Sequence, residues 1–218
     1  MSSIIFIGSP EKTPNKPTLT SFKDSFFVTP YDILFRIFAS FVPPLGKHYR
    51  LINVDFLGPS LALLILAAII NYGYSFKHVM SLGPNEFLSL YCLLVPGLFY
   101  VLSKYIGKSE INLSEIISLL GYALFGHIFT LSTSYICFQE ESNVFFFLSL
   151  ICFSGMSTLR LIIVVLKTIP RPGARLLVCS ILAIVQILSL IFVHFAYMHR
   201  TYKYRHVQQI NSEHLFDN

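Results

Sequence analysis

Only a few side chains of this sequence combine ionisable chemistry with apolar surroundings. Arg160, His127 and His194 lie inside long apolar stretches, and Asp55 and Glu115 stand at the beginning of two others. An ionisable group in such surroundings is costly, so each one is a candidate for an ion pair, a proton relay or a metal site. The spacing of these residues decides between those chemistries.

The spacing argues against the common catalytic and metal centres. Two isolated imidazoles are too few for a metal site or a proton relay, and the apolar stretches contain no Asp or Glu. The chain has no His-Glu-x-x-His motif, no Gly-rich phosphate loop and no nucleophile elbow. We therefore interpret His127 and His194 as hydrogen-bonded packing residues. We predict no enzyme activity, no cofactor and no metal.

The four cysteines offer no further catalytic site. Cys92, Cys137, Cys152 and Cys179 all fall in apolar stretches and lack the spacing of a zinc site. We expect small apolar packing residues and no disulfide framework. An intramembrane enzyme acting through Cys137 or His127 is the remaining alternative, and replacement of these residues would test it.

Arg160 is the clearest candidate for an ion pair. It precedes the end of its apolar stretch by about six residues, or roughly 9 Å of helical rise. From that depth its side chain either snorkels to the interface or pairs with a carboxylate of the same leaflet. Asp55 and Glu115 lie on that side, with Tyr122 at a similar depth. The sequence leaves the choice of partner open.

Five apolar stretches must position these side chains. A helix needs roughly 20 apolar residues to cross a hydrocarbon core of about 30 Å. With 54% hydrophobic and 12% charged residues, a soluble domain would lack enough polar surface. The expected fold class is therefore an all-α membrane protein with five transmembrane helices. They are expected at residues 56–76, 87–106, 116–138, 144–166 and 176–198.

The Lys and Arg residues beside the spans predict the orientation. The segment before the first span and the second and fourth connections are basic, which is typical of the cytosolic side. They contain Lys47, Arg50, Lys104, Lys108, Lys167, Arg171 and Arg175. The first connection offers only Lys77 as a cation, and the third offers Glu140 and Glu141 with no basic residue. We predict a cytosolic N-terminus and a short lumenal tail at 199–218, although that tail is itself basic.

The region before the first span divides into a flexible cytosolic tail, 1–30, and an amphipathic juxtamembrane segment, 31–55. Apolar residues at positions 33, 34, 37, 38 and 41 repeat at helical spacing, while Asp32, Arg36 and Ser40 occupy another face. The pattern predicts an interfacial helix on the cytosolic leaflet. Docking on the cytosolic ends of the spans fits the pattern equally well.

The same segment contains a candidate site for cytosolic partners. Tyr31-Asp-Ile-Leu34 fits the form of an aromatic residue, two others and an aliphatic residue that sorting and autophagy adaptors use. We prefer the interfacial helix to this hypothesis, because Leu34 cannot both bury in lipid and fill a partner's pocket. The candidate interaction residues are Tyr31, Leu34, Ile37 and Phe38.

Two short motifs, together with the five-span layout, resemble a known family. Asp55-Phe-Leu-Gly58-Pro59 resembles the Asp-Leu-Tyr-Gly-Pro motif of the Yip domain family, the Ypt/Rab-interacting proteins. Leu120-Gly121-Tyr122 resembles its second motif. Gly155 to Arg160 and His194 to Tyr197 look most like the third animal member, and the resemblance covers about residues 33–200. The family-motif residues are Asp55, Gly58, Pro59, Gly121, Tyr122, Gly155 and Arg160.

The resemblance implies a non-enzymatic Golgi protein with a Yip-type membrane domain at 56–198. Such proteins reside at the cis-Golgi or ER–Golgi boundary and support Golgi structure and vesicle traffic. The expected partners are another Yip-family member, a Rab GTPase or autophagy adaptor, and the lipid bilayer, with no nucleic acid. The alternative is a small transporter, channel or lipid-handling protein, in which Pro96, Arg160 and His127 line a path.

Overall fold

The computed structural model describes residues 28–42, 54–74, 82–137 and 143–198. These ranges are almost entirely helical, and the π-helical segments η2, η3 and η4 each continue or precede an α-helix. In chain order the elements are α2 (Pro30–Phe41), α3 (Leu57–Tyr74), α4 (Pro84–Val101), η2 (Leu102–Ile106), α5 (Leu113–Ile136), α6 (Val144–Ser149), η3 (Leu150–Gly155), α7 (Met156–Thr168), α8 (Pro172–Val193) and η4 (His194–Met198).

Five continuous helices are long and apolar enough to cross a membrane, which confirms the expected fold class. They are Leu57–Tyr74, Pro84–Ile106, Leu113–Ile136, Val144–Thr168 and Pro172–Met198. Three of them begin three or four residues before the apolar stretch, because polar or proline residues form the first turn. Glu86 and Glu115 accept hydrogen bonds from the backbone N–H groups of Gly83 and Asn112, three residues earlier.

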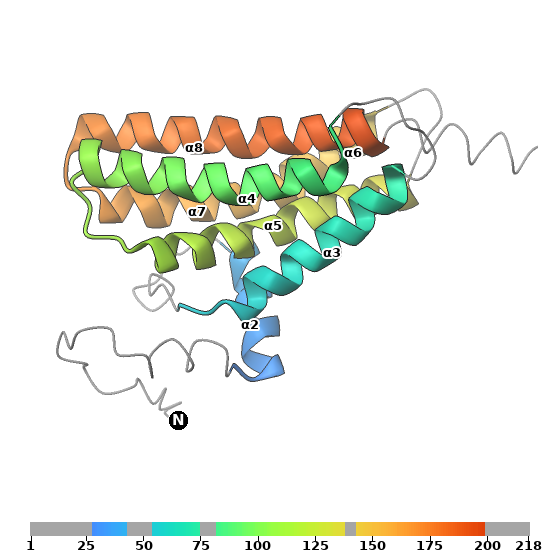
Figure 1. The fold of residues 1–218 in the computed structure, drawn as a ribbon, viewed down its shortest axis with the longest axis horizontal. Helices are drawn as coiled ribbons and strands as arrows, with labels where there is room; N and C mark the ends of the chain where they lie inside the picture. The colour runs from blue at the N-terminus through green and yellow to red at the C-terminus, as the bar shows by residue number, and fades with distance from the viewer. Residues whose placement is uncertain (1–27, 43–53, 75–81, 138–142, 199–218) are drawn as a thin grey trace, which may run out of the picture.

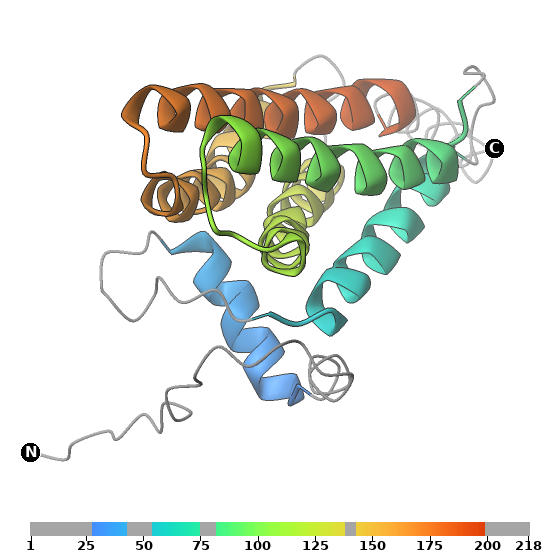
Figure 2. The ribbon, with the colours of Figure 1, turned by 60° about the vertical axis from the view of Figure 1, so that its left-hand side comes forward.

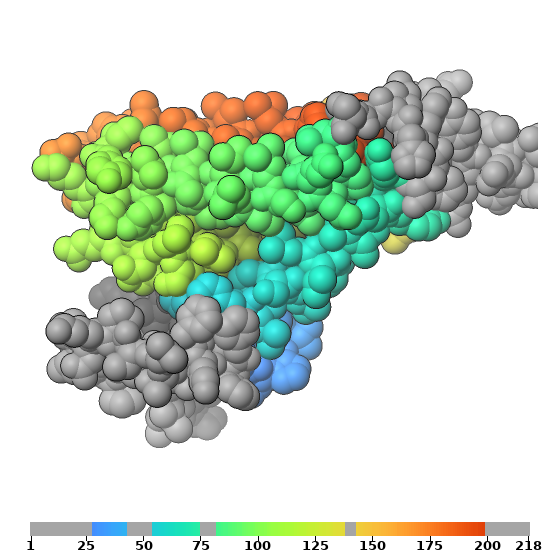
Figure 3. Space-filling view, viewed as in Figure 1, coloured from blue at the N-terminus to red at the C-terminus, as the bar shows by residue number. Residues whose placement is uncertain are grey.

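Helix α5 is the centre of the bundle. Of its most apolar 18-residue window, 72% is buried, against 22% to 44% for the other four spans. Helices α4 and α8 run side by side along one face, α7 lies beside α5, and α3 crosses α5 diagonally (Figures 1 and 2). In the space-filling view α4, α5 and α3 form one continuous surface (Figure 3). The residues of α5 therefore decide how the remaining helices are placed.

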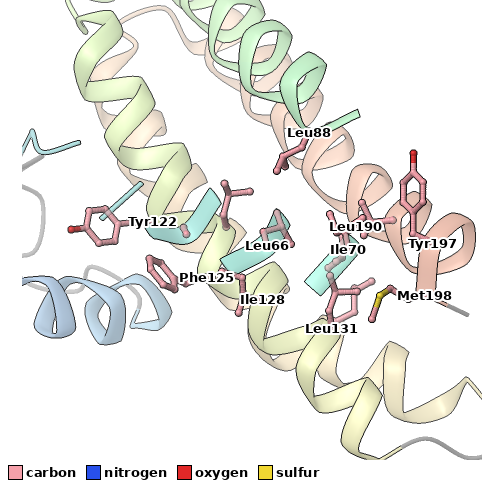
Figure 4. Close-up of a cluster of buried hydrophobic side chains, with 14 of the residues drawn as sticks. Leu66, Ile70, Leu88, Tyr122, Phe125, Ile128, Leu131, Leu190, Tyr197 and Met198 are labelled. Carbon is pink, nitrogen blue, oxygen red and sulfur yellow. The ribbon is translucent and has the colours of Figure 1, made fainter. Parts of the chain in front are cut away.

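The larger apolar core joins α2 and all five spans, and it reaches the end of the bundle where α3 finishes. Side chains from α3, α4, α5 and η4 meet in it, with Leu66, Ile70 and Leu131 almost fully buried (Figure 4). A second core lies between α4, α5, α7 and α8, toward the other end, and includes Ile116, Val165 and Val178. Packing of this kind, rather than hydrophobic exclusion, holds helices together in lipid.

Helix α4 stays helical through Pro96 and continues as η2 to Ile106. Several predictions from the sequence concern segments that lie outside the described residues. The flexible tail up to residue 27, part of the juxtamembrane segment at 43–53, the connections 75–81 and 138–142, and the tail 199–218 lie outside them. The proposed domain boundaries stay predictions there.

Helix α2 runs across the bundle instead of along it (Figures 1 and 2). Its last residue, Phe41, packs edge-on against Phe129 of α5 and Phe153 of η3, with ring centroids 5.3 and 6.2 Å apart. Phe129 is sixteen residues into α5, about 24 Å along that helix. The juxtamembrane helix therefore packs against the sides of α5 and η3. Its place at the cytosolic leaflet stays a prediction.

Candidate functional site

The carboxylate of Asp55 is the centre of a buried polar site between α2, α3 and α5. The residue is completely buried, and it stands just before α3 begins. Its Oδ2 accepts hydrogen bonds from the guanidinium of Arg36 on α2 and, at 2.9 Å, from the hydroxyl of Tyr122 on α5. Three segments that lie far apart in the sequence therefore share one negative charge.

The same carboxylate starts helix α3. Its Oδ1 accepts a hydrogen bond of 3.0 Å from the backbone N–H of Gly58, one of the first N–H groups of the helix, which have no partner within it. The next residue, Pro59, has no N–H to satisfy. The backbone N–H of Asp55 donates to Ser118 Oγ on α5 over 3.4 Å. Asp55 thus caps α3 and fixes that cap to α5.

The two motifs interlock through their glycines. A Cβ on Gly58 would lie 2.9 Å from Cε1 of Tyr122 and closer still to the end of that ring. A Cβ on Gly121 would lie 2.8 Å from Cα of Pro59 and closer to its ring atoms. Each motif therefore contributes the glycine against which the other's bulky residue packs. Small residues allow this close approach of two helices in a membrane.

Arg36 faces the bundle, contrary to the division of faces expected for α2. Its side chain is 24% exposed and forms the ion pair with Asp55. Ser40 is buried beside it and donates to the Ile37 carbonyl of its own helix, so burial leaves its hydroxyl satisfied. The predicted polar face of α2 is therefore wrong for these two residues, because each finds a partner inside the protein.

Of the four candidate interaction residues on α2, three are accessible. Tyr31 is 78%, Leu34 54% and Phe38 69% exposed, whereas Ile37 is buried. Ile37 is therefore a core residue and not a contact for a soluble partner. The exposed three lie three and four residues apart and therefore share one face of α2.

Arg160 pairs with neither of the two expected carboxylates. Asp55 bonds Arg36, and Glu115 accepts the N–H of Asn112 at the start of α5. The Nε of Arg160 is buried and has no hydrogen-bond partner among the described residues. Of the two alternatives for Arg160, the ion pair with Asp55 is not found, because helix α2 supplies the cation for that carboxylate. Snorkelling to the interface stays a prediction.

Gly155 ends segment η3 and does not make the closest contact of its motif. A Cβ on Gly155 would meet only the Leu150 carbonyl, at an ordinary 3.4 Å. The close approach between α5 and α7 instead involves Gly126, where a Cβ would lie 2.8 Å from Cβ of Ser157. Ser157 also donates to the Ala123 carbonyl over 3.4 Å.

A second cluster of buried polar residues joins α4, α5 and α8. The sequence analysis did not identify its central residue. Gln186 is completely buried, and its side-chain Oε1 accepts a 2.8 Å hydrogen bond from Tyr91. Its backbone carbonyl lies 3.2 Å from Nε2 of His127. A polar side chain within the apolar α8 was the available signal. His127 is thus a hydrogen-bonded packing residue, as predicted, while His194 stacks on Phe146 with ring centroids 3.7 Å apart.

The chemistry of the Asp55 site is that of a structural clamp. Its members hold one another by an ion pair and hydrogen bonds. Within the described ranges, no group of three His, Cys, Asp or Glu side chains is placed to hold a metal. All four cysteines are free thiols.

The match to a known family covers the clamp and all five spans. A family model of the YIPF3 C-terminal domain matches residues 30–198. The chain belongs to the Yip family. In this Yip-family protein the match begins at α2 and ends with η4, so both partners of the Arg36–Asp55 pair lie within it. No solved structure matches the chain.

Proposed function

We propose that this Yip-family protein is a non-enzymatic membrane protein of the Golgi and early secretory pathway. In this proposal it assembles with another Yip-family member and supports Golgi structure and vesicle traffic, with a Rab GTPase or an autophagy adaptor as the soluble partner. The observation that carries the proposal is the family match, which takes in α2 with the five spans. The buried polar residues described above hold helices together, which suits an assembly protein.

A groove between α3 and α5 supports assembly with a second membrane protein. It is open, almost wholly apolar, and lies at the end of α3. Ala68 and Ser132 contribute small side chains to it, which permit close approach of another helix. Its lining residues are Ala68, Ile69, Tyr72, Leu131, Ser132, Tyr135, Ile136 and Met198. We assign this groove to a helix of the Yip-family partner.

Filling the groove should abolish the assembly without unfolding the protein. We expect Ala68→Phe together with Ser132→Phe to reduce co-purification of other Yip-family proteins from mild-detergent extracts by at least about tenfold, because the small residues set the approach distance. Leu93→Phe is the matched control, since Leu93 is 74% exposed on α4, away from the groove. Co-purification undiminished by the double variant would remove the groove from the proposal, and recovery of no Yip-family protein with the wild type would contradict the assembly itself.

The proposed orientation has a cytosolic N-terminus and a lumenal C-terminus. An N-glycosylation acceptor joined after Asn218 should then be modified in cells, and the same acceptor joined before Met1 should stay unmodified. The natural sequon at Asn112 should also stay unmodified, since it lies at the basic end of the bundle. A glycan on the N-terminal acceptor would invert the orientation and remove the basis for cytosolic recruitment by residues 1–30.

A further inference from the structure

Arg160 is a partly buried cation that forms no ion pair with a described carboxylate. Its inner nitrogen Nε is shielded and unpaired, while the side chain as a whole is only partly buried. Three described carboxylates have other partners. Asp55 bonds Arg36, Asp32 bonds Thr29, and Glu115 bonds the start of α5. An arginine within an apolar stretch is costly, so an anionic group at this level would stabilise it.

The register between α5 and α7 places Arg160 at the level of the Asp55 site. Ser157 of α7 bonds the carbonyl of Ala123, and the two helices run in opposite directions. Arg160 is three residues beyond Ser157 and is therefore level with Leu120 of α5. Asp55 contacts Ser118 and Tyr122, which flank that same position.

Arg160 lies one turn beyond Ser157 on α7, and therefore on the side of that helix that meets α5. Helix α2 also packs against α7, and its Phe41 meets Phe153 of η3. Arg160 therefore lies on the helix that borders the place where α2 and the start of α3 meet α5.

The bundle is polar where α3 begins. Arg36 and the buried carboxylate of Asp55 lie there, at the level of Arg160.

We propose that Arg160 binds a phosphate group at this level, supplied by an anionic lipid of the leaflet at the basic end of the bundle. The two terminal nitrogens of a guanidinium match two phosphate oxygens in a bidentate pair. Lys167 and Arg171 lie on the same end and draw anionic lipid toward the site. The proposal is independent of the Golgi location and of the Yip-family partner.

Retention of a labelled lipid by the purified full-length protein tests the site. Phosphatidylserine carrying a dye on its acyl chain is mixed with the protein in detergent, and bound dye is measured after gel filtration. We expect Arg160→Gln to weaken retention at least about tenfold. Lys167→Gln, which removes an exposed charge from the same helix, should change it less than about twofold. Arg160→Lys should fold, because it keeps the charge, and its lipid retention should lie between those of Arg160→Gln and Lys167→Gln. This variant keeps the test valid if Arg160→Gln misfolds.

Competition identifies the source of the phosphate. Unlabelled phosphatidylserine should displace the dye-labelled lipid, and inorganic phosphate at millimolar concentration should not. Equal displacement by inorganic phosphate would support the phosphate site but overturn the lipid as its source. Unchanged retention by Arg160→Gln would overturn the site. Loss of a co-purifying membrane protein in that variant, with lipid retention unchanged, would overturn it in favour of a carboxylate on the partner.

Discussion

Replacement of Asp55 by alanine should destabilise this Yip-family protein more than any other single change at the clamp. The substitution leaves the Arg36 guanidinium inside the bundle without its counter-charge and removes the acceptor of the Tyr122 hydroxyl and the Gly58 N–H. Breaking a buried ion pair by removing one partner costs about 3–5 kcal/mol. We expect the thermal stability in detergent to fall steeply, measured as the temperature at which half of the monodisperse gel-filtration peak is lost. Helix α2 should then detach from α5.

Two comparisons isolate the ion pair from the loss of a side chain. Asp32→Ala removes an exposed carboxylate from the first turn of α2 and should cost only about 0.3–1 kcal/mol. Asp55→Leu combined with Arg36→Leu removes both charges and should recover part of the loss, since no unpaired charge stays buried. If Asp55→Ala were no more harmful than Asp32→Ala, the clamp would not hold α2 in place.

Gly121→Val should be the second large effect, because it separates the two motifs. Any Cβ at this position overlaps Pro59, including its backbone Cα, and a backbone atom cannot turn aside as a flexible side chain does. Overpacking of this kind costs about 1–3 kcal/mol and occasionally more. We expect a loss of about 3 kcal/mol, seen as reduced thermal stability in detergent. Proteolysis near the start of α3 should become faster, since that is the end that must move.

Gly97 provides the matched control. It lies inside α4 with nothing within 4 Å of a Cβ built on it. Gly97→Ala should be neutral or stabilise the helix by up to about 1 kcal/mol, through the ordinary difference in helix propensity. The loss of stability for Gly58→Ala should lie between those of Gly121→Val and Gly97→Ala, because the new Cβ meets atoms at the far end of the Tyr122 side chain. A tolerated Gly121→Val would show that α3 and α5 do not need this close approach.

The five spans could be read from the sequence because the bilayer sets their length and polarity locally. Each stretch carries its own evidence in about 20 consecutive residues, and the structure places a helix on every one. The helix starts were misplaced by three or four residues at Pro84, Leu113 and Pro172, since caps and first turns are polar or contain proline. The family motifs were equally local, because each is only a few residues long.

The partners of the charged residues could not be read in the same way. Asp55 pairs with Arg36, 19 residues away, and with Tyr122, 67 residues away, and not with Arg160, which was one of the alternatives. Each of these pairings depends on how far one helix is rotated and shifted along another. The apolar surfaces of the spans allow many such arrangements, so sequence spacing does not select one.

By itself the sequence determined the membrane class, the five helices, the lack of a recognisable catalytic cluster and the resemblance to the Yip family. Those conclusions follow from composition and from motifs confined to single segments. The tertiary structure decided that α2 lies against the sides of α5 and α7, that Asp55 is its anchor, and that the glycines of the two motifs face each other's bulky residues. The physical reason is that a helix forms from contacts within one segment, whereas its neighbours are chosen by close packing and charge pairing between segments.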